Sequence, residues 1–345
     1  MKKKRKTKYI IISTCCIIIF ILVISIYCSF LLNSKISDRD KDIIVKIEYG
    51  SSLFDIITTL NDVDLLKPRW LFFKILQFYA YTTNKPILAG YHKFSPNITN
   101  GELIYSLFSG NNFYMCRVTF PEGITIKRFA SILQDKLSID SSYFYNLCYD
   151  KKIIDKYGIN SNSLEGYLNP ATFNFFIDID AEKIIDILVK EQLKVLKKFE
   201  KEINEIRFTQ LEVLTLASII EAETPVIYER AKISGVYHNR LKRKMLLQAD
   251  PTVQYIIGGK KRLLYSDLAI DSPYNTYRYK GLPPGPINSP SKTSIEAAVK
   301  PENNNYLFFV ASGDGTNTHK FSSNYKIHKK NVAAFRKIIK SKKNE

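Results

Sequence analysis

The chain has 345 residues, 45% of them hydrophobic, and 51 Lys and Arg against 33 Asp and Glu give a formal net charge of +18 at pH 7. That length leaves room for two domains behind an N-terminal segment. The charge fits attraction to an anionic polymer, a wall glycan or a membrane surface, and it equally fits a composition rich in Ile, Lys, Asn and Tyr. No arginine-rich helix, zinc-ligand spacing or aromatic RNA-binding signature accompanies it, so we predict no nucleic-acid partner.

The N-terminus joins a basic cluster to a long uncharged segment. Residues 1–8 contain six Lys and Arg, whereas residues 9–32 carry no charge. Because about 20 apolar residues cross a bilayer, we predict a single transmembrane helix over 9–32, with residues 1–8 in the cytoplasm and the rest outside. A cleaved signal peptide is the alternative, but its apolar core is usually about 7–15 residues long. The expected location is a bacterial inner membrane, facing the periplasm.

A polar linker, residues 33–42, leads into a first domain over residues 43–112. Its apolar patterns and cap residues predict, in chain order, a strand at 43–47, a helix at 53–60 capped by Ser51 or Ser52, a helix at 69–79, a strand at 90–94 and a helix from 100 that ends at Gly110. The domain holds no paired acids in an apolar setting, so we expect it to carry no chemistry.

The second domain covers residues 113–345. Its patterns predict a strand at 116–120, a helix at 125–137, one long amphipathic helix at 181–206, helices at 209–223 and 225–242, strands at 306–310 and 319–321, and a basic C-terminal helix. Residues 248–287 read as irregular chain whose tyrosine, amide and acidic side chains suit a binding cleft. The fold class is therefore α+β, with strands and helices in both domains.

Five cysteines are present, three of them in the apolar N-terminal segment. Cys116 and Cys148 remain, and a single pair does not make a disulfide framework, so their pairing stays open. No Cys and His residues share metal-ligand spacing, and we predict no metal and no cofactor.

Two carboxylates close the apolar helix at 209–223. Glu221 and Glu223 precede Thr224 and Pro225, and we expect Thr224 to cap a new helix that starts at Pro225. The helix C-terminus and apolar neighbours would both raise the pKa of Glu223. A carboxylic acid that stays protonated near neutral pH can serve as a general acid. Residues two apart do not share a helix face, so we do not expect the two acids to form a close pair.

Six segments in order make the chain resemble the MltG/YceG-like endolytic murein transglycosylases. They are Leu164–Tyr167, Ala217–Thr224, Asn239–Leu241, Gln248–Val253, Tyr274–Tyr277 and Gly281–Ile287. The resemblance implies an inner-membrane anchor, a small LysM-like subdomain at 43–112 and a mixed α/β catalytic domain at 113–345 with a central Glu-bearing helix. Ala171 stands where the family usually has an acid, which puts the contribution of that acid in doubt.

The resemblance places the catalytic acid/base at Glu223. Glu221 is assigned either a supporting role or a structural ion pair, and Asp250 is either a second acid at the site or a turn residue. The expected sugar-binding side chains are Gln248, Tyr274, Asn275 and Tyr277. The reaction implied is cleavage of the bond between N-acetylmuramic acid and N-acetylglucosamine without water, leaving a 1,6-anhydro end on nascent glycan strands.

Two other functions stay open at this point. A muramidase-type hydrolase on the same scaffold would use a second carboxylate at about 5–5.5 Å or 6.5–9.5 Å from the first. A non-catalytic peptidoglycan-binding scaffold would bind glycan and release nothing. In each case the expected partners are peptidoglycan strands, the membrane and peptidoglycan synthases.

Overall fold

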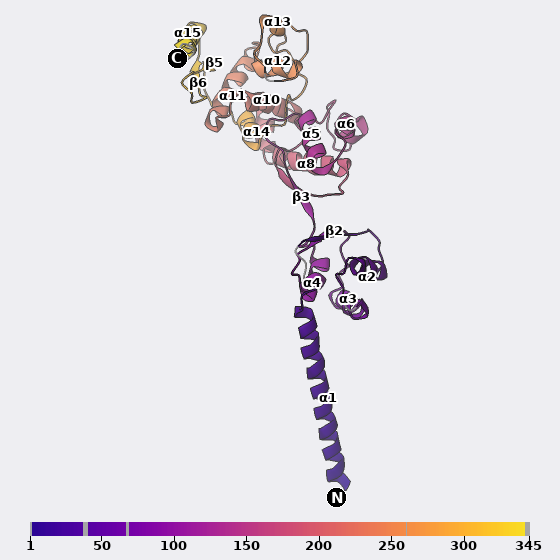
Figure 1. Ribbon diagram of the computed structural model, residues 1–345. Helices are drawn as coiled ribbons and strands as arrows, with labels where there is room; N and C mark the ends of the chain where they lie inside the picture. Colours follow the sequence, from indigo (N-terminus) through magenta and orange to yellow (C-terminus); the bar gives the residue numbers. More distant parts are fainter. Residues whose placement is uncertain (1, 37–40, 67–68, 260, 342–345) are drawn as a thin grey trace. The chain divides into compact units, whose positions relative to one another are not determined.

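A computed structural model of the chain describes residues 2–36, 41–66, 69–259 and 261–341. The chain divides into two compact units, unit 1 over residues 1–116 and unit 2 over residues 117–345 (Figure 1). Each unit has its own buried core, and each is described by itself below. Both units combine helices with short antiparallel strands, as the predicted α+β class requires.

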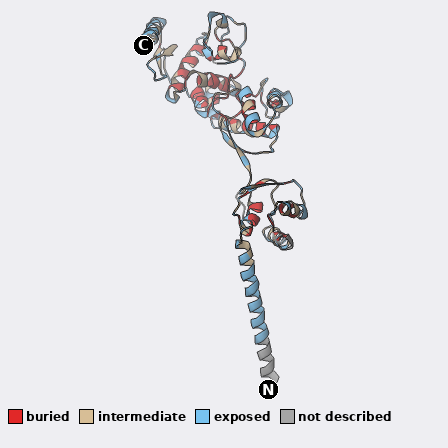
Figure 2. Ribbon diagram, in the orientation of Figure 1, coloured by how far each residue is buried: buried red, intermediate tan, exposed pale blue. Residues whose placement is uncertain are grey.

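The N-terminal helix α1 (Lys2–Asn33) contains the predicted apolar segment. Its residues Ile11–Asn33 have a mean hydropathy of 2.9, and in the described part of the chain this is the one helix long and apolar enough to cross a membrane. In Figure 2 the described part of α1 is coloured mostly as exposed, although large apolar side chains normally avoid water. A lipid environment would remove that conflict, so the helix fits a single-pass anchor.

In unit 1 two strands pair with each other, and two helices separate them in the sequence. Strand β1 (Ile43–Ile47) pairs antiparallel with β2 (Gly90–Phe94), and α2 (Leu53–Asp62), α3 (Arg69–Thr83) and α4 (Asn100–Ser109) complete the unit. Ser52 and Asp55 form a capping box that starts α2, and Gly110 ends α4 in the left-handed region at φ 72°. The strand and helix positions predicted for this region are confirmed. The core includes Ile57, Leu60, Leu76, Phe94, Leu103 and Leu107.

Unit 2 is mostly helical, with two pairs of strands. Strand β3 (Met115–Thr119) pairs with β4 (Thr172–Phe176), and β5 (Phe308–Ala311) pairs with β6 (His319–Ser322). The helices are, in chain order, α5 (Ile126–Leu137), α6 (Ser141–Leu147), α7 (Lys151–Asp155), α8 (Ala181–Lys197), α9 (Glu200–Ile206), α10 (Gln210–Glu223), α11 (Ile227–Lys242), α12 (Asp250–Ile256), α13 (Tyr265–Leu268), α14 (Lys292–Val299) and α15 (Tyr325–Ser341). Cys116 and Cys148 are thiols and form no disulfide.

Helix α10 is buried all round. Thr209 and Glu212 form a capping box at its start, and every residue from Val213 to Ile220 is buried. A helix that is apolar on every side must lie inside the protein, and α10 packs against α11, α12 and α14. The Glu-bearing C-terminal turn of α10 is therefore held from three directions.

Three predictions about the helices are wrong in detail. The helix expected over 181–206 is broken into α8 and α9, because Phe199 turns into the core and is only 5% exposed. The chain from 248 to 287 is not wholly irregular, because Pro251 lies in the first turn of α12, where a missing N–H costs nothing.

The third concerns the junction between α10 and α11. Thr224 ends α10 with extended backbone at φ −144° and ψ 133°, as a residue before proline prefers, and α11 begins only at Ile227. The Thr224 hydroxyl accepts the Val226 N–H at 3.0 Å and so forms a tight turn around Pro225. Thr224 therefore closes one helix and does not cap the next.

Candidate active site

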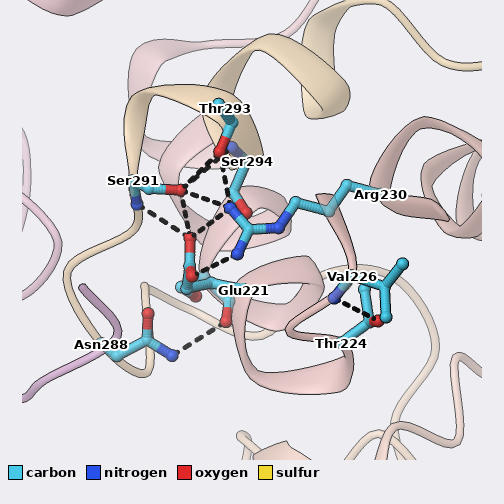
Figure 3. Close-up of polar contacts among 9 residues, drawn as sticks. Glu221, Thr224, Val226, Arg230, Asn288, Ser291, Thr293 and Ser294 are labelled. Carbon is cyan, nitrogen blue, oxygen red and sulfur yellow. Dashed lines mark hydrogen bonds and ion pairs between the residues drawn. The ribbon is translucent and has the colours of Figure 1, made fainter. Parts of the chain in front are cut away.

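Glu221 is the carboxylate of a buried ion pair. It lies on α10 and receives Arg230 of α11 on both oxygens, at 2.8 Å and 3.2 Å. Both side chains are 5–6% exposed. Ser291, which caps α14, donates to the same carboxylate from its N–H at 2.9 Å and from its hydroxyl (Figure 3). This network joins three helices, so Glu221 forms a structural ion pair, and a supporting role at the site stays a prediction.

The same turn of α10 also fixes the loop that follows Gly285. The Ser218 hydroxyl accepts the Ile287 N–H at 3.0 Å, and the Ser218 carbonyl accepts the Asn288 side-chain amide at 2.8 Å. Both Ser218 and Asn288 are buried. The segments that carried the resemblance at 217–224 and 281–287 thus contact each other directly, although Ser218 and Ile287 are 69 positions apart in the sequence.

Glu223 lies two residues further along α10 and has different partners. Its Oε1 accepts the hydroxyl of Tyr237 from α11 at 2.5 Å. Burial raises the pKa of Glu223 to about 7; the Tyr237 hydrogen bond and the Arg240 charge oppose this shift, and the Asp250 charge adds to it. Glu223 is half-buried as a residue, so its carboxyl is shielded from bulk water and still reachable. The carboxyl therefore holds its proton to a much higher pH than an exposed glutamate does.

A cavity of about 360 Å³ opens beside Glu223. Gln248, Asp250 and Tyr277 line it, as do Arg240 and His319. The hydroxyl of Tyr277 donates to Asp250 through a short hydrogen bond, which is one reason, after burial, that the pKa of Tyr277 is raised. The cavity thus holds a protonatable acid, a second carboxylate that is already hydrogen-bonded, and amide and aromatic groups.

The structure brings Glu223, Gln248, Asp250 and Tyr277 together and leaves two expected side chains elsewhere. Asn275 is fully buried, and its amide donates to the carbonyls of Leu268 and Ile270 at 3.0 Å and 2.8 Å, which holds the loop in shape. The ring of Tyr274 packs against Tyr255 with centroids 5.1 Å apart. Neither residue lines the cavity beside Glu223.

Ala171, the departure from the family pattern, lies just before β4. Its carbonyl accepts the N–H of Phe120 at 3.0 Å, directly after β3. Ala171 does not line the cavity beside Glu223. Its contribution in this chain is therefore a backbone one, at the end of a strand pair.

Some residues at the site were not predicted as site residues, although Arg240 belongs to the Asn239–Leu241 segment that carries part of the resemblance. Tyr237 and Arg240 belong to α11. Arg240 donates to the carbonyls of Leu247, which follows α11, and Leu307, which precedes β5, both at 2.7 Å. These two bonds hold both segments against α11. The N–H and ring of His319 bind the Glu229 carboxylate at 3.0 Å and 2.8 Å. The sequence pattern indicates only that these residues lie on α11 or β6. It does not show which side chains they contact, because those partners lie far away in the sequence.

This arrangement can supply one proton and take one back. A carboxyl with a pKa near the operating pH serves both as acid and as base. In the described part of the chain no three His, Cys, Asp or Glu side chains gather as metal ligands. The chemistry that these residues themselves can perform is therefore proton transfer at Glu223, with Asp250 and Tyr277 placed to orient a bound molecule.

Comparison with known proteins gives consistent matches over most of the chain. The profile of the YceG-like family matches residues 45–334. An endolytic murein transglycosylase of Bacillus subtilis (strain 168) is 34% identical over 334 residues, which cover 92% of this chain and 90% of that protein. An endolytic murein transglycosylase of Streptococcus pneumoniae serotype 2 is 31% identical, and the match covers 86% of this chain and 59% of that longer protein.

A solved structure also matches this chain over most of its length. A yceG-like protein from Listeria monocytogenes is 33% identical to this chain and superimposes with a TM-score of 0.60. The superposition covers 85% of this chain and 99% of the Listeria chain. The similarity therefore extends across both units and is not confined to the helix that carries the two glutamates.

Proposed function

The chain belongs to the YceG-like family, and from this premise we propose that it is an endolytic murein transglycosylase. Its substrate is the peptidoglycan glycan strand, and its product is a 1,6-anhydro-N-acetylmuramic acid end. The relatives that carry this name in Bacillus and Streptococcus match over most of the present chain. The observation that carries the mechanism is a single carboxyl, Glu223, whose pKa is raised to about 7 beside a cavity.

Glu223 acts first as an acid in this mechanism. Its proton passes to the glycosidic oxygen as the bond from C1 of N-acetylmuramic acid to N-acetylglucosamine breaks. The C6 hydroxyl oxygen of the same muramoyl ring then bonds to C1, and its proton returns to the Glu223 carboxylate. The enzyme ends as it began, and no water is consumed. Burial supports the first step because it keeps the carboxyl protonated at a pH where an exposed glutamate would be ionised.

The other cavity residues orient the sugar. The Asp250 carboxylate can accept hydrogen bonds from hydroxyl and acetamido N–H groups, the Gln248 amide can accept or donate them, and Tyr277 offers a ring face as well as its hydroxyl. The short bond from Tyr277 fixes the Asp250 carboxylate in one position. A fixed negative charge beside C1 would also favour the cation-like transition state of glycosidic cleavage. Asp250 is thus a supporting residue in this proposal and not a nucleophile.

The origin of the new oxygen at C1 tests the proposal. In water enriched in ¹⁸O, digestion of uncrosslinked glycan should give anhydro ends that carry no heavy oxygen, because the C6 hydroxyl is the nucleophile. The measurement is mass spectrometry of the released saccharides. Reducing ends that carry ¹⁸O would mean that water attacks C1, and the hydrolase function would then replace the lytic one.

The position of the enzyme in the cell follows from α1. We propose that α1 is retained as a single anchor in the inner membrane, with its basic N-terminus in the cytoplasm and unit 2 outside, where the nascent glycan and its synthases are found. The basic residues 1–8 support this orientation. Protease added to wall-free cells should degrade unit 2. A protected unit 2, or a mature chain that begins after residue 30, would contradict the anchor.

Unit 1 beyond α1 has the order strand, helix, helix, strand that the predicted LysM-like subdomain requires. We assign to it a guiding role for the glycan without chemistry. Removal of residues 43–112 should therefore weaken glycan binding or change product length, measured by chromatography of the products, while some cleavage remains. Cleavage by the isolated segment would contradict this assignment.

A further inference from the structure

A second and larger cavity lies on the other side of the Glu-bearing turn. Its volume is about 450 Å³, and its lining includes Ala222 and Pro251. The neighbouring residues Glu223 and Asp250 line the first cavity. The end of α10 and the start of α12 therefore form a wall with one cavity on each face. The proposed mechanism uses only the face that carries Glu223.

Tyrosine rings form one side of this second cavity. Tyr145 and Tyr149, at the end of α6 and just after it, have ring centroids 4.8 Å apart and remain 38% and 41% exposed. Tyr255 of α12 also lines the cavity. Large aromatic rings that stay exposed around a concave site commonly mark a place where a ligand is bound. Such rings can pack against the apolar faces of a pyranose.

A buried polar atom in the lining has no partner. Asn288 is 4% exposed and donates its amide to the Ser218 carbonyl at 2.8 Å, but its Oδ1 has no hydrogen-bond partner among the described residues (Figure 3). Buried polar atoms are almost always satisfied, so an orphan acceptor beside a cavity is unusual. A ligand N–H or O–H would satisfy it. The acetamido N–H of an amino sugar is such a donor.

The acids of this cavity are arranged for a neutral ligand. The Glu221 carboxylate is already paired with Arg230. Glu165 accepts the Ile126 N–H at 3.1 Å at the start of α5, and burial raises its pKa to about 8. Burial also raises the pKa of Glu122, with a further increase from the nearby Glu221 charge. A carboxyl with a pKa of about 8, such as Glu165, is protonated at neutral pH, so it donates a hydrogen bond to hydroxyl or carbonyl oxygens and does not attract cations.

We propose that this second cavity is a binding subsite for one N-acetylhexosamine unit of the glycan strand, packed on Tyr145 and Tyr149 with its acetamido N–H directed to Asn288. The inference rests on the proposed function in one respect: the sugar bound here belongs to the same glycan strand that is cleaved beside Glu223. A strand that crosses the wall between the cavities would be held on both faces. Binding of one sugar in this subsite would then position the glycosidic bond that is cleaved beside Glu223.

The test uses the full chain in detergent with chitotetraose, a peptide-free N-acetylglucosamine tetramer, as the probe. Binding is measured by calorimetry in a Glu223→Gln background, so that turnover cannot interfere. Tyr149→Ala should weaken binding about tenfold, and Tyr145→Ala should do likewise, because each removes a ring that covers the sugar. Tyr228→Ala is the matched control, because Tyr228 is 76% exposed on α11 and lines neither cavity.

A separate readout uses chains with Glu223 intact. Tyr149→Ala should raise KM for uncrosslinked glycan while kcat is retained, because it removes binding that the substrate and the transition state share. Chitotetraose binding that is unchanged in both tyrosine variants, or absent from the parent chain at millimolar probe, would overturn the subsite. Loss of anhydro product from the parent chain with tyrosine-dependent binding intact would instead overturn the lytic function alone.

Discussion

The two glutamates at the end of α10 have opposite environments although only one residue separates them. Glu221 is paired with Arg230 and hydrogen-bonded by Ser291, so its charge is neutralised inside the protein. Glu223 has one hydroxyl partner and a cavity beside it, and its pKa is raised to about 7. The comparison shows that two glutamates on one helical turn can have different roles: Glu221 joins helices, and Glu223 holds a transferable proton.

The physical origin of this difference is the direction in which each side chain leaves the helix. Residues i and i+2 point to different sides of an α-helix. The side of Glu221 meets α11 and the cap of α14, which supply a cation and a hydroxyl. The side of Glu223 meets Tyr237 of α11 and Asp250, the first residue of α12, which supply a phenol and a second carboxylate. Burial on one side of the helix therefore raises the pKa of Glu223, whereas on the other side Glu221 is held in an ion pair with Arg230.

The largest expected effect separates the two acids by activity. Glu223→Gln keeps the shape of the side chain but cannot release a proton, so it should reduce kcat by about 10²–10⁴-fold while the protein stays folded. Glu221→Gln, assayed well below its melting temperature, should cost far less per folded molecule. Anhydro-product formation is the assay. Equal losses in the two folded variants would show that the two acids do not have separate roles.

The second prediction separates the same two acids by stability. Glu221→Gln leaves the buried Arg230 charge without its counterion, and breaking such a pair typically costs about 3–5 kcal/mol of the free energy of unfolding. Urea unfolding at pH 6 is the measurement, with Glu223→Gln as the matched variant that breaks no ion pair. A double variant, Glu221→Gln with Arg230→Met, should recover part of the loss. A destabilisation by Glu223→Gln as large as that by Glu221→Gln would contradict the comparison.

The third prediction concerns the pH dependence of stability. Glu165 and Glu223 have folded-state pKa values of about 8 and about 7, raised from an ordinary 4.5 mainly by burial. As pH rises through 4.5 the unfolded chain ionises first, so it binds fewer protons than the folded chain and stability falls. The decline should continue to about pH 8 and reach about 5 kcal/mol for Glu165 and about 3 kcal/mol for Glu223.

Single variants allow each contribution to be measured. Glu165→Gln retains an oxygen that can accept the Ile126 N–H but cannot ionise, so the decline in stability between pH 5 and pH 9 should become shallower. Urea midpoints at the two pH values provide the measurement. Asp155→Asn, at an exposed acid on α7, is the control and should leave the slope unchanged. A steeper decline in Glu165→Gln would contradict the sign of the effect.

The smallest effect tests the hydrogen bond to Glu223. The Tyr237 hydroxyl lowers the pKa of Glu223, in opposition to burial. Tyr237→Phe keeps the buried ring and its edge contact with Phe309 but removes the hydroxyl. The pKa of Glu223 should therefore rise further, and the alkaline limb of kcat/KM should move to higher pH by about one unit. A shift to lower pH would mean that the phenol favours the protonated form.

The sequence by itself determined the class of the protein and much of its local structure. Hydrophobic period and cap residues act over a few positions, so they located β1, β2 and α2, and they identified α10 as a buried helix that ends in two acids. The uncharged length after the basic N-terminus indicated α1 in the same way. Ordered motifs indicated the family, because six short segments rarely recur together by chance.

Only the tertiary structure decided which partner each acid receives. The break between α8 and α9 depends on the burial of Phe199 in the core, which a local pattern does not contain. Arg230, Ser291 and Tyr237 become neighbours of the two glutamates only when α11 and α14 pack against α10. Desolvation and hydrogen bonding come from that packing, so the raised pKa of Glu223 is a property of the fold and not of the segment that contains it.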